Sequence, residues 1–105
     1  MTTAEFFRKD GEVIGFKVKG HSGYAEQGED VVCASVSSAV MLTANVITEV
    51  FGYEADVSAY EDTITLKTNI KGDEKLQKLY EMLISQLQHI ALEFENNLKV
   101  QFTEV

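Results

Sequence analysis

The stretch GHSGYAEQGEDVVCAS, residues 20–35, contains the residue types of a nucleophilic thiol centre. Cys33 is the only cysteine of the chain, and His21 is one of its two histidines. A thiolate is a strong nucleophile, and a histidine beside it can act as a general base or as the positive half of an ion pair. A carboxylate that orients the imidazole would complete such a site, and the candidates are Glu26, Glu29 and Asp30.

The place of Cys33 along the chain matters as much as its residue type. If Asp30 caps a helix, Cys33 is near the helix start, beside free backbone N–H groups and the positive end of the helix dipole, which favour the thiolate. Ser37 follows four residues later on the same helical face, where its hydroxyl could bond near the thiolate or serve only as a small packing residue. A free cysteine is often a small buried residue, so a structural Cys33 remains an alternative.

The sequence contains no further motif for chemistry. The glycines at positions 20, 23 and 28 do not follow a dinucleotide-binding fingerprint, and no phosphate loop with its lysine is present. One cysteine and two distant histidines give no ligand cluster with the spacing of a metal site, and His89 is expected on the surface of a helix. We therefore expect no metal and no cofactor.

Two hairpins are predicted to frame this stretch. Residues 4–8 and 13–19 are β-prone segments around Asp10 and Gly11, a pair typical of a tight hairpin turn. Residues 54–59 and 63–68 form a second pair around Glu61 and Asp62, and the alternation in TITLKT is that of a half-buried strand.

Two helices and a last strand complete the prediction. Apolar residues recur every three or four positions from Val32 to Phe51, and Gly52 is placed to end that helix. Asp73 is predicted to cap a second helix whose inward stripe is Leu76, Leu79, Leu83, Leu87, Ile90 and Phe94. Residues 98–102 return as a strand, so the order is ββαββαβ. We predict an α+β fold: a small antiparallel sheet from two hairpins plus a C-terminal strand, with two helices packed on one face.

Length and charge limit the classes of protein. The 105 residues suit one domain, 1–105, and 45% of them are hydrophobic, which is enough for a core. A net charge of −8 argues against direct nucleic-acid binding and leaves open a basic protein segment as a partner, although an acidic surface more often serves solubility alone. A single cysteine forms no internal disulfide, and we see neither a signal sequence nor a run approaching the ~20 apolar residues of a membrane span. We therefore expect a cytoplasmic protein.

Residues 20–37, GHSGYAEQGEDVVCASVS, resemble the signature of the ribosomal-processing cysteine protease Prp family. The shared pattern is Gly-His, a small residue, Gly-Tyr-Ala, a short link, Gly-x-Asp, two aliphatic residues, Cys, and a serine four positions on. The likeness extends over the chain in length, opening hairpin and helix order. The motif is specific because several fixed residue types recur at fixed intervals over eighteen positions.

The resemblance implies a cytosolic bacterial endopeptidase that removes a short N-terminal extension from a large-subunit ribosomal protein, cutting after an aromatic residue. It implies a catalytic Cys–His dyad with Cys33 as the nucleophile and His21 as the general base, supported by Asp30 and Ser37. It also implies a homodimer. The substrate loop that it predicts includes Gly20, Ser22, Gly23, Tyr24 and Gly28.

Two other interpretations of the sequence stay open. In the first, the protein is a non-catalytic dimeric domain that binds a ribosomal or other basic protein, and Cys33 is structural. In the second, it is a thiol enzyme of another class, such as a transferase or a redox sensor.

Overall fold

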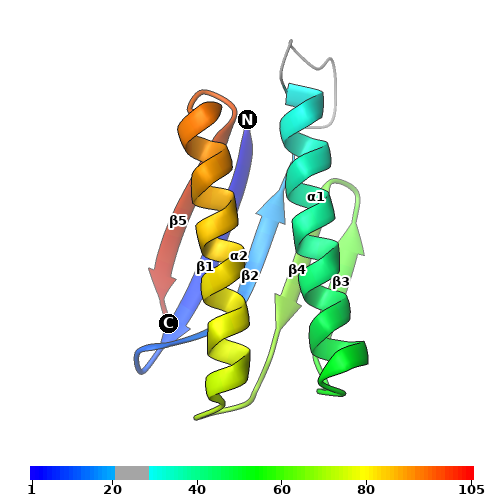
Figure 1. The fold of residues 1–105 in the computed structure, drawn as a ribbon, viewed down its shortest axis with the longest axis vertical. Coiled ribbons are helices and arrows are strands. Elements are labelled where there is room, and N and C mark those ends of the chain that lie inside the picture. Colours follow the sequence, from blue (N-terminus) through cyan, green and yellow to red (C-terminus); the bar gives the residue numbers. More distant parts are fainter. Residues whose placement is uncertain (21–28) are drawn as a thin grey trace.

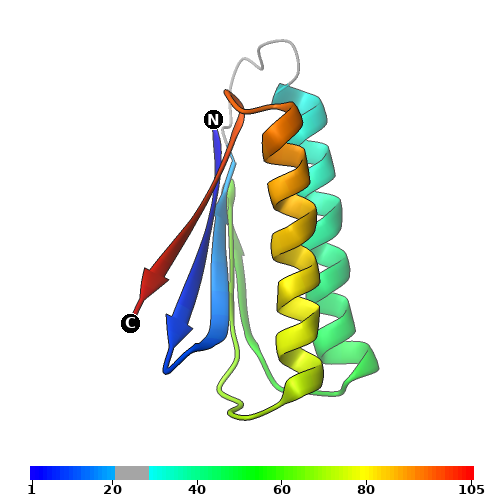
Figure 2. The same cartoon turned by 60° about the vertical axis from the view of Figure 1, so that its left-hand side comes forward.

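The chain folds into a five-stranded sheet with two long helices on one of its faces (Figures 1 and 2). The structure is a computed structural model and describes residues 1–20 and 29–105. Its elements are β1 (Thr2–Lys9), β2 (Glu12–Lys19), α1 (Glu29–Asn45), the π-helical turn η1 (Val46–Val50), β3 (Asp56–Tyr60), β4 (Thr63–Lys67), α2 (Glu74–Glu93) and β5 (Leu98–Glu104). The predicted α+β class and the order ββαββαβ are confirmed.

The sheet has the strand order β3-β4-β2-β1-β5. The two hairpins pair antiparallel, and β2 and β4 join them, also antiparallel. β5 pairs parallel with β1, beginning with Thr2 opposite Leu98, so the sheet is mixed. β1 therefore lies between β2 and β5 and bonds to a strand on each side.

Both predicted turns are present, and their backbone angles show why the residues suit them. Asp10 and Gly11 have φ values of 53° and 82°, the left-handed region that a tight two-residue hairpin requires. Glu61, at the second turn, has a φ of 55°. Between Phe7 and Arg8 the register of the first hairpin shifts, which marks a β-bulge.

α1 supplies one side of the core. The predicted stripe is confirmed, because Val32, Val36, Val40, Ala44 and Ile47 are all buried. Gly52 follows with a φ of 71°, as expected for a residue that ends a helix.

The start of α1 differs from the expectation. The helix begins at Glu29 and includes Asp30, so the interpretation of Asp30 as its cap is wrong. Cys33 is thus the fifth helical residue, two positions further in than a capping Asp30 would place it.

The apolar character of α1 is stronger than expected. The segment Val31–Val50 has the length and composition of a helix that could cross a membrane, although a third of it is buried inside the fold. The expectation that no run approaches such a span is therefore wrong. Here the segment serves as the core helix, because its buried stripe packs in the main hydrophobic cluster of the domain.

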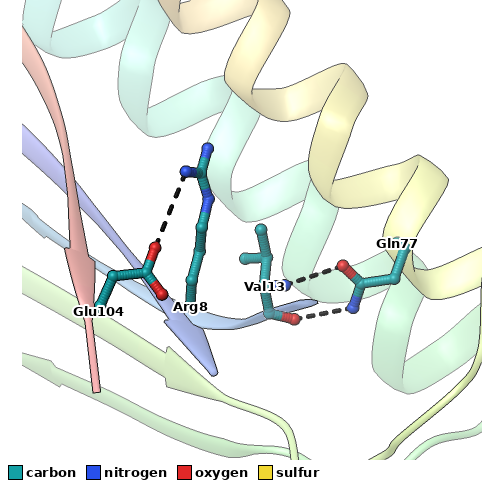
Figure 3. A network of polar contacts seen from close by, with 4 residues as sticks. All are labelled: Arg8, Val13, Gln77 and Glu104. Atoms are coloured by element: carbon teal, nitrogen blue, oxygen red, sulfur yellow. Dashed lines mark hydrogen bonds and ion pairs between the residues drawn. The ribbon is translucent and has the colours of Figure 1, made fainter. Parts of the chain in front are cut away.

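α2 is fixed at its start by a capping residue and along its length by side-chain contacts. The Asp73 carboxylate accepts a hydrogen bond from the Leu76 N–H at 2.9 Å, which confirms the predicted cap. Hydrogen bonds from the Tyr53 hydroxyl and from that N–H hold the pKa of Asp73 below its usual value. The Gln77 amide donates to the Val13 C=O and accepts from the Val13 N–H, each at 2.8 Å, which ties α2 to the start of β2 (Figure 3). The same view includes the ion pair of Arg8 with Glu104, which joins β1 to β5 at 4.0 Å.

Candidate active site

The Cys33 sulfur lies where α1 passes over the ends of β1 and β2. The thiol is free and half-buried, and its Sγ is 3.3 Å from the Thr2 Oγ1. Gly20 is the second close neighbour, since a Cβ built on Gly20 would lie 3.9 Å from that sulfur. Residues 2, 20 and 33 are far apart in sequence, and the sheet and α1 bring them together.

Each neighbour of the sulfur is held by a backbone hydrogen bond. The Gly20 N–H donates to the Asp62 C=O at 2.8 Å, which ties the end of β2 to the β3–β4 turn. The Thr2 N–H donates to the Asn97 C=O, also at 2.8 Å, just before β5 begins. These two described neighbours of Cys33 Sγ are therefore held in place by the sheet.

The predicted site residues divide into three groups. The structure brings Cys33 and Gly20 together. Ser37 is exposed on α1, one helical turn beyond Cys33, and Asp30 belongs to the first turn of the same helix. The remaining predicted residues lie outside the described part of the chain: His21, Ser22, Gly23, Tyr24 and Gly28.

Thr2 is a neighbour of the sulfur that the sequence analysis missed. The predicted strand began at Ala4, so Thr2 was left outside it, whereas β1 begins at Thr2. A signal was present, because Thr2, Ala4 and Phe6 alternate at period two and all three are buried against the helices. Extending the alternation by one step would have placed Thr2 on the core face.

The free N–H groups at the start of α1 lie further from Cys33 than expected. In an α-helix each N–H bonds to the carbonyl four residues earlier, so the Cys33 N–H donates to the Glu29 C=O. The helical N–H groups without such a partner belong to Glu29, Asp30 and Val31. The expectation that Cys33 lies directly among free N–H groups is thus wrong, because Cys33 is two residues beyond the last of them.

Other parts of the described structure offer less for chemistry. Among residues 1–20 and 29–105, no group of three or more His, Cys, Asp or Glu side chains could hold a metal ion. A hollow of about 510 Å³ lies at the far end of the sheet, beside the β1–β2 turn, and one of about 540 Å³ lies between α1 and α2. Cys33 lines neither hollow.

Comparison with known proteins identifies the family. A family model described as Cysteine protease Prp matches residues 1–99. The chain belongs to this family. The protein is accordingly a cysteine protease, and the interpretation of the chain as a non-catalytic domain is set aside. This identification rests on nearly the whole chain and not on the motif alone.

Curated Prp relatives cover most of the chain. The ribosomal processing cysteine protease Prp of Bacillus subtilis is 29% identical over 97 residues, spanning 87% of this chain and 87% of the relative. The protein of the same name from Staphylococcus aureus (strain Mu50) is 23% identical over 96 residues, spanning 89% and 90%.

Solved structures share the Prp fold. The essential ribosomal processing protease Prp from S. aureus, in complex with a substrate peptide, has a TM-score of 0.91 at 21% identity and covers 98% of this chain and 100% of its own. SMU.848 from Streptococcus mutans has a TM-score of 0.82 at 23% identity and covers 100% and 96%. At these identities the likeness establishes the fold.

Proposed function

We propose that this Prp protein is an endopeptidase that removes a short N-terminal extension from a large-subunit ribosomal protein, with Cys33 as nucleophile and His21 as general base. The observation that carries the dyad is the position of Gly20, whose Cβ site lies 3.9 Å from Cys33 Sγ. His21 is the next residue, and consecutive Cα atoms are about 3.8 Å apart. The names of the B. subtilis and S. aureus relatives support a ribosomal protein as the substrate.

The proposed chemistry proceeds through an acyl-enzyme. His21 takes the thiol proton as Cys33 Sγ attacks the scissile carbonyl, and it returns that proton to the departing amine. A water molecule, deprotonated by His21, then attacks the thioester and releases the new carboxylate, and the proton returns to the thiol. The N–H groups of Glu29, Asp30 and Val31 are the candidate donors to the tetrahedral oxyanion, because they have no acceptor within α1.

Asp30 and Ser37 are the proposed supporting residues. Both lie on α1. Asp30 is three residues before Cys33, and Ser37 is four residues after it. Asp30 would orient or charge the imidazole, as a carboxylate does in other thiol and hydroxyl sites. Ser37 is exposed and would contact the substrate or the imidazole from the solvent side.

The substrate loop belongs to the same proposal. Gly20, Ser22, Gly23, Tyr24 and Gly28 would admit an extended peptide and then exclude bulk water while the thiolate attacks the peptide bond, a function suited to a glycine-rich segment. The net charge of −8 favours a basic ribosomal protein over nucleic acid as the bound partner. The cytoplasmic location and the homodimeric state implied by the family resemblance are further parts of the proposal.

Cleavage of an N-terminally extended ribosomal protein by four proteins tests the dyad: wild type, Cys33→Ala, His21→Ala and His89→Ala. Mass spectrometry of the new N-terminus reports cleavage, and circular dichroism checks folding. We expect no cleavage by the first two variants and wild-type cleavage by His89→Ala, because the second histidine is exposed on α2. Wild-type rates from folded Cys33→Ala or His21→Ala would overturn the assignment.

A further inference from the structure

The hydroxyl of Thr2 is the one described side-chain oxygen recorded in contact with the proposed nucleophile. Thr2 Oγ1 and Cys33 Sγ are 3.3 Å apart, and either atom could donate the hydrogen bond. No cap, turn or sheet bond needs this hydroxyl, because the backbone of Thr2 makes its own bond to Asn97. The contact is therefore available to act on the sulfur.

Ionisation of the thiol fixes the direction of this hydrogen bond. A thiolate has no proton to give, so the Thr2 O–H must be the donor once Cys33 is ionised. Hydrogen bonds to an ionised acceptor are shorter and stronger than neutral ones, and a bond made to the charged form favours that form. The same contact thus holds the thiolate more tightly than the thiol.

Thr2 is well placed to hold its hydroxyl still. The residue is 1% exposed and begins β1 between β2 and β5, with its N–H bonded to Asn97 at 2.8 Å. A β-branched side chain in a strand has restricted rotation about χ1. The donor therefore comes from the rigid sheet, on the side of Cys33 away from the solvent.

We infer that Thr2 is a positioning residue for catalysis: its hydroxyl donates to the Cys33 thiolate and holds the sulfur beside Gly20. The inference rests on the proposed function, in which Cys33 is the nucleophile. The ionisable groups on the segments that meet at or flank this site include the Met1 amino group, Lys19, His21, Glu26, Glu29, Asp30, Glu61 and Asp62. Substitutions at Thr2 leave all of them in place, so a change in thiol reactivity reports the hydroxyl.

The test is the alkylation rate of Cys33 by iodoacetamide from pH 5 to pH 10 in wild type, Thr2→Val and Thr2→Ser. Valine keeps the shape of threonine without the hydroxyl, and serine keeps the hydroxyl. Thr3→Val is the matched control, because Thr3 is the next residue of β1 and points to the opposite face of the sheet. Thermal unfolding of each variant confirms that it is folded.

If the hydroxyl acts on the thiolate, the alkylation profiles of wild type and Thr2→Val against pH should cross. Loss of a charge-assisted bond should move the midpoint of the Thr2→Val profile upward by about one pH unit, a tenfold change in the thiolate fraction at low pH. The intrinsic nucleophilicity of a thiolate also rises about threefold for each unit by which its basicity increases. Thr2→Val should thus react about threefold more slowly than wild type at pH 6 and about threefold faster at pH 10. Thr2→Ser and Thr3→Val should follow wild type.

Two outcomes would overturn the inference. Superimposable profiles for wild type and Thr2→Val would mean that the hydroxyl does not act on the thiolate. A Thr2→Val rate lowered by one factor at every pH would mean that Thr2 only controls access or packing. Should valine fail to fold here, Thr2→Ala and Thr2→Ser form a second pair that differs in the hydroxyl alone.

Alkylation also separates this inference from the proposed function. It reports the reactivity of the sulfur and needs no peptide substrate. A folded Cys33→Ala protein that still cleaves would remove Cys33 from catalysis whatever the profiles show. Crossing profiles together with an inactive Cys33→Ala protein would support both the proposed function and the role of Thr2. Peptide cleavage by Thr2→Val should then show a lowered kcat at unchanged KM.

Discussion

Among the described glycines, Gly15 leaves the least space for a side chain. A Cβ on Gly15 would lie 2.3 Å from the carbonyl oxygen of Leu66, which is backbone and cannot rotate away. Leu66 belongs to β4, which pairs with β2. In Gly15→Ala, β4 would have to move away by roughly 1 Å to restore ordinary van der Waals contact. We expect such overpacking to lower the free energy of unfolding by about 1–3 kcal/mol.

Gly20→Ala is the matched control for this prediction. A Cβ on Gly20 meets Asp62 O at 3.6 Å and Cys33 Sγ at 3.9 Å, which are ordinary contacts. Both substitutions reduce the conformational entropy of the unfolded chain by the same amount, about 0.4–1 kcal/mol in favour of folding. The difference between the two variants therefore isolates the clash at Leu66.

Thermal unfolding followed by circular dichroism measures this difference. A loss of 1 kcal/mol lowers the Tm of a domain of this size by about 4–8 °C, so Gly15→Ala should melt well below wild type. Gly20→Ala should melt at or slightly above it. Equal melting temperatures for the two variants would refute the close approach of β2 and β4, and with it the reason for a glycine at position 15.

Two further substitutions test how the core is held. Burial raises the pKa of Tyr80 to about 12, so the folded state keeps the phenol proton after the unfolded chain has lost it near pH 10. Because of this group, the free energy of unfolding of wild type should fall by about 1.4 kcal/mol per pH unit between pH 10 and 12. Urea titrations of Tyr80→Phe should show a smaller fall over the same range, because phenylalanine has no proton to lose. Gln77→Met removes both bonds to the Val13 backbone and should cost about 1–3 kcal/mol in thermal unfolding, with faster amide exchange at Val13. A Tm within 1 °C of wild type would mean that water replaces the Gln77 amide at no loss.

Local patterns in the sequence were enough to predict most of the elements. Asp10-Gly11 marked the first turn because its residues tolerate a positive φ, and Asp73 marked the start of α2 because its carboxylate can accept from the helix N–H groups. The buried stripe of α1 followed from spacing alone. In each case the signal lies within a few residues of the feature that it predicts.

Features that depend on distant pairing could not be predicted in the same way. Nothing near Leu98 indicates that β5 pairs parallel with β1, so the strand on that side of β1 could not be predicted. The helix start was misplaced because Asp30 has the chemistry of a cap, yet α1 begins before it. The motif indicated Cys33 as the nucleophile, but its contact with Thr2 exists only once the sheet has formed.

The parallel pairing of β1 with β5 also sets an order of events during synthesis. Leu98, the strand partner of Thr2, is synthesised about 5–20 s after Thr2 at ordinary elongation rates. Until then the Thr2 N–H has no Asn97 carbonyl to bond, and β1 has a partner on one side only. The backbone of β1, with Thr2 at its start, is thus held on both sides only after β5 has paired with it. Until then the nascent chain carries the Cys33 thiol without a fixed Thr2 beside it.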